Sequence, residues 1–253
     1  MKCFRQIADY QTYHREHKSK KIGFVPTMGA LHAGHGSLIQ QSVEECDVTV
    51  LSIYVNPTQF NNPADLAKYP DTIEQDMKFA ETLGVDVVLL PDYQQLYPDG
   101  FRYLVDETEF SHTLCGEHRP GHFTGVLTVV MKLINIVKPR LAFFGEKDYQ
   151  QLSLIRGMAE AFFLDVDIIA GSTVRESDGL AMSSRNLNLG SDERARARGL
   201  NEILKGSLDD EAAARELSCR GFEVDYIRTV DGRRFGAASL GGVRLIDNVA
   251  VGK

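Results

Sequence analysis

The sequence has few cysteines, and their pattern is not one that stabilises secreted proteins or binds metals. Its four cysteines, Cys3, Cys46, Cys115 and Cys219, are dispersed over 253 residues. A disulfide framework or a zinc site would show regular, paired spacings, which are missing here. We therefore expect reduced thiols and a cytoplasmic location.

Basic clusters and long apolar runs are also missing. The net charge is −7, and no block of Lys and Arg interrupts the sequence, which argues against nucleic acid or an anionic membrane as a partner. No apolar run is long enough to cross a bilayer, and the polar N-terminus lacks the apolar core of a signal peptide. We expect no nucleic-acid partner and no membrane partner.

Strands and helices alternate over the first two-thirds of the chain. Short apolar runs predict strands, and helical periodicity appears between them; the strands are expected at 22–25, 48–55, 85–90, 141–145 and 166–170. This alternation predicts an α/β domain, residues 1–174, with a Rossmann-like, mostly parallel sheet and helices on both faces. Near Arg175 this alternation of strands and helices ends.

The last third of the chain predicts a separate small domain. Helices are expected at 192–205 and 210–219, followed by short strands at 224–230 and 243–246. We therefore expect a C-terminal α+β lid domain over residues 175–253.

Two histidines, His32 and His35, follow the first predicted strand, which we expect Pro26 and Gly29 to end. They lie where a strand turns into a helix, and the free N–H groups and dipole of a helix start favour an anion. Gly34 between them lets a ligand approach the backbone. The pattern favours a nucleotide triphosphate. Two surface histidines, or a zinc site for which no Cys, Asp or Glu lies nearby, are the alternatives.

Two further segments carry phosphate-binding groups after predicted strands. In the first, 141–148, Lys147 follows a strand and can reach the crevice where parallel sheets bind ligands. In the second, the polar loop 173–186, two hydroxyls and the Arg185 guanidinium could contact several phosphate oxygens. Taken singly, the first could be a solvated surface lysine and the second an interdomain linker.

Five blocks in the same order along the chain resemble the pantothenate synthetase family of nucleotidylyltransferases. They are Val25–His32, Asn56–Phe60, Arg119–Phe123, Phe144–Asp148 and Gly179–Asn186. The resemblance implies an ATP-dependent ligase that joins pantoate to β-alanine through pantoyl adenylate and releases AMP and pyrophosphate. It also implies Mg²⁺ with the ATP, and a homodimer. The first domain would then bind nucleotide and pantoate.

The resemblance also assigns roles to residues. It implies that His32, His35, Lys147 and Arg185 are catalytic, and that His35, whose imidazole should titrate near the working pH, protonates the leaving group. ATP would contact Met28, Gly29, Ala30, Leu31, His32, Ala33, Gly34, His35, Gly145, Glu146, Lys147, Asp148, Val174, Met182, Ser183, Ser184 and Arg185. Pantoate would contact Pro26, Met28, Asn56, Gln59, Val126, Val129 and Gln151, although core packing explains the two valines equally well. No residue is assigned as a metal ligand.

Three positions depart from the family pattern. Ala33 stands where Glu is common, Gly36 where a bulky apolar residue is usual, and Asp71 where Arg is frequent. A helical glycine costs roughly 1 kcal/mol relative to alanine, so we expect a looser first turn at Gly36. Another small-molecule adenylyltransferase and a non-catalytic nucleotide-sensing module remain alternative functions. The intact Lys147 and both histidines argue against the second.

Overall fold

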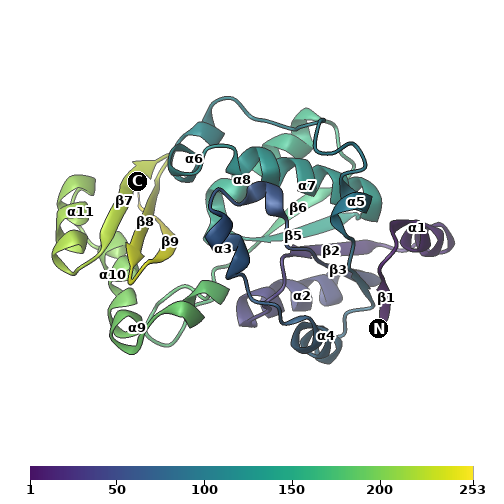
Figure 1. Cartoon of the computed structure of the whole chain (residues 1–253), viewed down its shortest axis with the longest axis horizontal. Coiled ribbons are helices and arrows are strands. Elements are labelled where there is room, and N and C mark those ends of the chain that lie inside the picture. The colour runs from purple at the N-terminus through teal and green to yellow at the C-terminus, as the bar shows by residue number, and fades with distance from the viewer. Residues whose placement is uncertain (253) are drawn as a thin grey trace.

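A six-stranded parallel sheet forms the centre of the first domain (Figure 1). The computed structural model describes residues 1–252. The strands run in the order β1-β4-β3-β2-β5-β6, and every neighbouring pair is parallel. Their bounds are β1 (Lys2–Phe4), β2 (Ile22–Thr27), β3 (Val48–Ile53), β4 (Val87–Leu89), β5 (Leu141–Gly145) and β6 (Asp167–Gly171). The predicted parallel α/β domain is confirmed.

The order of the strands reverses between β2 and β5. From β2 the chain moves to β3 and β4 on one side, and it later returns to β5 and β6 on the other. Such a reversal opens a crevice at the carboxyl ends of the strands. The opening begins early, because β2 pairs with β5 only at Gly23 and Phe24.

Pro26 lies inside β2, so the prediction that it ends the strand was wrong. The strand continues to Thr27, which is in register with Ile53 of β3. The carbonyl of Ile22 accepts a hydrogen bond from the β5 side, and alternation along the strand turns Pro26 to that same side. Because pairing with β5 has ended there, the missing N–H of Pro26 costs no hydrogen bond in the sheet.

Helices cover both faces of this sheet. On one face, α2 (Ala33–Glu45) and α4 (Ile73–Thr82) pack on alternate strand residues such as Val25 and Phe143. On the other, α1 (Ile7–Glu16), α7 (His122–Val137) and α8 (Tyr149–Ala161) pack on Phe24 and Phe144. No helix among residues 1–252 has the length and apolar composition needed to span a membrane. Short helices complete the domain: η1 (Pro57–Gln59), α3 (Pro63–Ala67), α5 (Tyr93–Leu96), η2 (Phe110–His112), α6 (Cys115–His118) and η3 (Glu146–Asp148).

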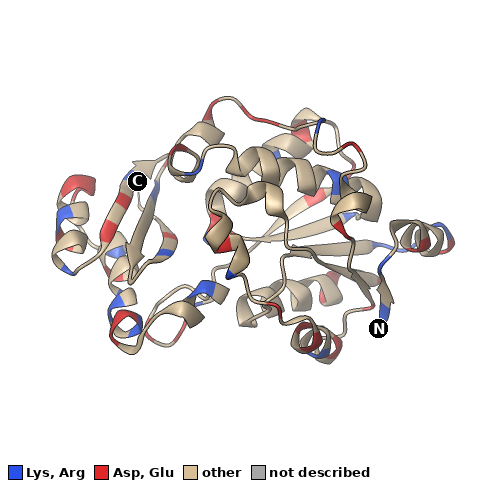
Figure 2. Cartoon of the chain, in the orientation of Figure 1, with Lys and Arg blue, Asp and Glu red and all other residues tan. Residues whose placement is uncertain are grey.

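The second domain has its own sheet and its own core. Its antiparallel strands are β7 (Glu223–Val230), β8 (Arg233–Leu240) and β9 (Val243–Ala250), in that spatial order. Its helices are η4 (Ser184–Asn188), α9 (Ser191–Ala197), α10 (Gly199–Lys205) and α11 (Asp210–Cys219). Both acidic and basic residues lie on its helices (Figure 2). The predicted small α+β unit is confirmed. Its boundary at residue 175 stays a prediction, and Lys253 lies outside the described residues.

The central strand of that sheet, β8, was not predicted from the sequence. Its residues include Gly236, Ala237 and Ala238, which are weak strand formers. The tertiary structure supplies the reason for these small residues: a Cβ at Gly236 would lie 3.0 Å from Leu204 and 3.1 Å from Leu200 of α10. Close packing of the helix on the sheet therefore selects residues that propensity alone disfavours.

Close packing also predicts the effect of a mutation at Gly23 in β2. A Cβ there would lie 2.8 Å from Cys46 Sγ and closer still to Ser42 Oγ of α2. Gly23→Ala should therefore lower the free energy of unfolding by about 1–3 kcal/mol, as overpacking does. Urea unfolding measures this. Gly157→Ala in α8 is the control, because a Cβ at that position would have nothing within 4 Å, and it should stabilise the helix by up to about 1 kcal/mol. Equal stabilities of the two variants would contradict the packing argument.

Candidate functional site

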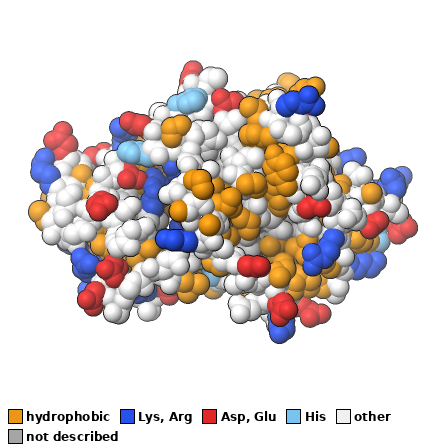
Figure 3. All heavy atoms as spheres, viewed as in Figure 1, with side chains coloured by type: hydrophobic (Ala, Val, Ile, Leu, Met, Phe, Trp, Pro, Cys, Tyr) orange, Lys and Arg blue, Asp and Glu red, His pale blue; other side chains and the backbone are white. Residues whose placement is uncertain are grey.

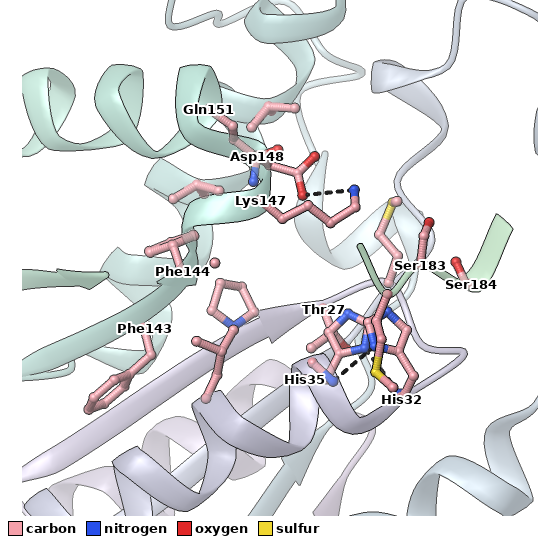
Figure 4. A pocket seen from close by; sticks show the side chains of 18 of the residues that line it. Thr27, His32, His35, Phe143, Phe144, Lys147, Asp148, Gln151, Ser183 and Ser184 are labelled. Carbon is pink, nitrogen blue, oxygen red and sulfur yellow. Dashed lines mark hydrogen bonds and ion pairs between the residues drawn. The ribbon is translucent and has the colours of Figure 1, made fainter. Parts of the chain in front are cut away.

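A cavity lies at the carboxyl ends of β2 and β5 and receives side chains from both domains (Figure 4). The histidines lie along one side of it, Lys147, Asp148 and Gln151 along another, and Ser183 and Ser184 close a third. Most predicted site residues line this cavity: Pro26, Met28, His32, Gly34, His35, Asn56, Gln59, Val126, Val129, Gly145, Lys147, Asp148, Gln151, Val174, Met182, Ser183, Ser184 and Arg185. Segments far apart in sequence are therefore brought together.

Five predicted nucleotide contacts do not line the cavity: Gly29, Ala30, Leu31, Ala33 and Glu146. For the turn after β2, the buried Asp76 of α4 explains why. Its carboxylate accepts hydrogen bonds from the N–H groups of Ala30 (2.9 Å) and Leu31 (2.7 Å). A protein carboxylate thus occupies the N–H groups of two residues that the family resemblance assigns to ATP. Gly29 allows the turn, since its φ is +83°.

The two histidines hold each other and cap helix α2. His32 is the N-cap residue, and its Nδ1 accepts a hydrogen bond from the Gly34 N–H at 3.1 Å. His35 Nδ1 accepts from the His32 N–H at 3.3 Å, and the ring centroids lie 4.1 Å apart. Because each Nδ1 is an acceptor, each neutral ring carries its proton on Nε2. The motif thus supplies two N–H donors as well as a helix cap.

Burial keeps both imidazoles neutral. It lowers the pKa of His32 to about 4, helped by Lys147. It lowers the pKa of His35 to about 3, helped by the neighbouring His32. The expectation that His35 titrates near the working pH was therefore wrong. A charged ring would lose its hydration there and lie beside a second ring.

The first turn of α2 is not loose, although Gly36 replaces a bulkier residue. The Gly36 N–H donates to the His32 carbonyl at 2.9 Å. Phe79 of α4 fills the space, since a Cβ at Gly36 would lie 3.2 Å from the Phe79 ring. The apolar side chain missing from α2 is thus supplied by α4.

Charged groups face the histidines across the cavity. Lys147 Nζ lies 3.5 Å from Asp148 Oδ2. Burial raises the pKa of Asp148, but Lys147 and Arg185 outweigh it and hold that pKa below its ordinary value. Arg185 donates to Asp65 of α3 at 3.0 Å. The Ser183 hydroxyl accepts from the Arg185 N–H and so fixes the start of η4.

Two glutamines offer free amide groups in the cavity. Gln59 Oε1 accepts a hydrogen bond from Asn56 Nδ2 at 3.0 Å, which leaves the Gln59 NH₂ group without a partner among residues 1–252. The Gln151 amide has no protein partner there either. Asn56, only 1% exposed, is otherwise bound by Tyr97, Thr58 and the Gly125 carbonyl. Its amide is therefore used in holding Gln59.

Arg119 and His122 bind the backbone of Gln59. Both donate to the Gln59 carbonyl, His122 Nδ1 at 2.8 Å and Arg119 at 3.2 Å. Burial lowers the pKa of His122 to about 3, helped by Arg119, and that of Arg119 to about 10. The neutral His122 ring thus donates through Nδ1 and accepts from Arg119 through Nε2. Neither residue was assigned a role from the sequence.

One stripe of α7 contributes to the apolar wall of the cavity. Val126 and Val129 are buried in the core and also line the cavity, and their contact with pantoate stays a prediction. Further lining residues were missed: Thr27, Leu38, Tyr54, Tyr69, Val130, Leu133, Phe143, Phe144, Ser172 and Thr173. For Val130 and Leu133 a signal existed, because they continue the helical spacing of the two valines.

A groove between the domains continues from this cavity. Lys and Arg side chains gather where the domains meet (Figure 3), and Arg119, Arg185 and Arg244 line the groove with Lys147. Over residues 1–252, no three His, Cys, Asp or Glu side chains are grouped so that they could hold a metal ion. The two histidines therefore lack the further ligands that a zinc site needs.

Known proteins resemble the whole chain. A family model for pantoate-beta-alanine ligase matches residues 2–250. The pantothenate synthetase of Bdellovibrio bacteriovorus is 54% identical over 98% of both chains, and that of Coxiella burnetii strain Dugway 5J108-111 is 46% identical over 100% of this chain and 98% of its own. The crystal structure of pantoate-beta-alanine ligase from Francisella tularensis, complexed with beta-gamma ATP and beta-alanine, has a TM-score of 0.94 at 42% identity and covers 99% of this chain and 97% of its own.

The lowered pKa values of His32 and His35 predict a loss of stability in mild acid. A histidine whose pKa is lower when folded leaves the unfolded chain binding more protons, so stability is lost as pH falls below the unfolded value. From about pH 6.5 to about pH 5, His35 should contribute a loss of about 1–2 kcal/mol. Urea unfolding at several pH values measures this. His35→Gln should flatten the dependence. An unchanged slope in His35→Gln would show that this ring is not kept neutral by folding.

Proposed function

The chain belongs to the pantoate–β-alanine ligase family, and we propose how its cavity divides the work of that reaction. The protein joins pantoate to β-alanine, using ATP, through a pantoyl-adenylate intermediate, and releases AMP and pyrophosphate. One observation carries the assignment of roles: the two histidines, Lys147 and the Ser183–Arg185 loop share one cavity with the free amides of Gln59 and Gln151. Nucleotide-binding and acid-binding groups thus meet in one place.

The first step joins two anions. A pantoate carboxylate oxygen attacks the α-phosphorus of ATP, and pyrophosphate leaves with the electron pair of the broken P–O bond. Catalysis then rests on positioning and on stabilising the added negative charge. Lys147 and Arg185 supply positive charge, and His32 and His35 supply neutral Nε2–H donors. A bound triphosphate places negative charge beside these rings, which raises their pKa values.

ATP enters as its Mg²⁺ complex in this proposal. Mg²⁺ would need few protein groups, and it would supply positive charge to the phosphates. Asp148 would be the protein group that holds Mg²⁺, because its carboxyl group lines the cavity and has a lowered pKa, which favours the ionised form. The Ser183 and Ser184 hydroxyls add neutral contacts on the side of the second domain.

Pantoate lies deeper in the cavity, against α7. Its two methyl groups suit the apolar wall of Val126 and Val129, and burying them there is favourable. Its hydroxyls and carboxylate suit the free amide groups of Gln59 and Gln151, since an amide both donates and accepts. Asn56 acts indirectly, because its own amide is occupied by Gln59 and neighbouring groups.

In the second step, the β-alanine amine attacks the acyl carbon of the adenylate, and AMP leaves. The neutral amine is the nucleophile, so a proton must be lost as the amide forms. The arginine-lined groove between the domains gives a carboxylate-bearing amine a path to the cavity. We also propose a homodimer in the cytoplasm, as the family resemblance implies.

Isotope exchange tests the adenylate. Because the chemistry divides at pantoyl adenylate, pantoate and MgATP should support exchange of labelled pyrophosphate into ATP without β-alanine. AMP release should require all three substrates. The measurement follows both, with each substrate omitted in turn. Exchange that strictly requires β-alanine would contradict a free-standing adenylate.

Alanine at either glutamine tests the pantoate site. Leaving a buried polar partner unsatisfied costs about 1–3 kcal/mol, so Gln59→Ala or Gln151→Ala should raise the pantoate KM by tens- to a hundred-fold. The KM for ATP and the Tm should change little. Gln40→Ala, on the exposed side of α2, is the matched control and should leave both KM values unchanged. A large fall in Tm with an unchanged pantoate KM would make these glutamines structural.

A further inference from the structure

The side chain of Asn248 in β9 reaches across the domain boundary to the turn that carries Lys147. Its Nδ2 donates one hydrogen bond to the Glu146 carbonyl and one to the Lys147 carbonyl, each 2.9 Å long. Its Oδ1 accepts a hydrogen bond from Arg233. Asn248 is only 4% exposed. An amide whose donors and acceptor are all engaged has one orientation, so it fixes the groups it touches.

The turn is held at its far end as well. The Arg233 guanidinium, which orients Asn248, also lies 3.7 Å from the centre of the Tyr149 ring, where α8 begins. The second domain thus contacts the backbone just before Asp148 and the side chain just after it. Lys147 lines the cavity, and it also lines a smaller one together with Tyr149 and Asn248.

The strand that carries Asn248 is itself firmly anchored. Its neighbour Asp247, 4% exposed, accepts two hydrogen bonds from Arg175, at 2.7 and 2.9 Å, and one from Asn201 at 2.7 Å. Arg175 also donates to the Gly179 carbonyl and pairs with Ala181, at the base of the loop that leads to Ser183. Adjacent residues of one strand therefore hold the loop and the Lys147 turn.

We propose that Asn248 is a positioning residue that fixes the Lys147 ammonium relative to the reacting phosphates. It touches no substrate and acts through the backbone of the Glu146–Asp148 turn. The inference rests on the proposed role of Lys147 in adenylation. It predicts that the second domain takes part in the chemistry through β9, in addition to the serines and arginine of its first loop.

A double-mutant cycle tests this inference with the full-length protein. Lys147→Ala should lower the rate of pantoate-dependent pyrophosphate exchange by about 10²–10³-fold, as the loss of a preorganised donor does. Asn248→Ala should lower kcat by roughly 10–10²-fold through misplacement, with little change in the pantoate KM. The double variant should be no slower than Lys147→Ala alone, because Asn248 acts only through Lys147.

Two further variants separate positioning from stability. Asn248→Asp keeps the size of the side chain but removes both donors, so it should lose activity at least as strongly as the alanine variant. Arg234→Ala is the matched control: Arg234 is buried and donates to the Gly206 and Leu208 carbonyls, wholly within the second domain. It should lower the Tm while leaving the exchange rate per folded enzyme unchanged.

Each outcome decides between the two proposals. Losses that multiply in the double variant would overturn the inference about Asn248 and leave the role of Lys147 standing. So would an Asn248→Asp enzyme of normal kcat, or an Arg234→Ala enzyme that loses activity as Asn248→Ala does. A near-normal Lys147→Ala enzyme would overturn the proposed role of Lys147 and the inference with it.

Discussion

The early separation of β2 from β5 is the constraint on which the rest of the site depends. The two strands pair at Gly23 and Phe24 only, and beyond that point their connections lead to opposite sides of the sheet. The gap between their carboxyl ends receives the histidine motif from β2 and Lys147 from β5. It also explains how a proline fits inside β2, because the edge that Pro26 presents has no strand left to pair with. The position of the cavity thus follows from the order and pairing of the strands.

The electrostatics of the cavity follow from how each group is held. The two imidazoles use their Nδ1 atoms to cap α2 and brace each other. With their lowered pKa values they are neutral donors, and neither ring carries a charge beside the other. The cations are placed apart, with Lys147 beside Asp148 and Arg185 beside Asp65. In this arrangement each cation has a carboxylate partner, and the neutral imidazoles need none.

Much of the fold could be predicted because local patterns agreed with it. Apolar runs ending in Gly or polar residues marked β2, β3, β5 and β6, and the helix predicted at 210–219 has those bounds. The strand β8 could not be predicted in this way. Its small residues are selected by contact with Leu200 and Leu204, which are distant in sequence. Local propensity contains no information on such contacts.

The candidate site residues could be predicted from the sequence because three polar segments follow predicted strands, in blocks that resemble one family, although each segment alone also had a plain structural explanation. His32, His35, Lys147, Ser183 and Arg185 lie in these segments, and the cavity contains them all. Their states were decided by the tertiary structure. Burial and the neighbouring His32 lower the pKa of His35 far below its ordinary value. The carboxylate of Asp76 accepts from the N–H groups of Ala30 and Leu31, and the Asn56 amide donates to Gln59. The sequence by itself shows which polar residues follow each strand, since residue type and order can be read locally. For parallel strands this also indicates that these residues lie at the same edge of the sheet. Hydrogen-bond partners and burial depend on residues far along the chain, and only the folded structure places those.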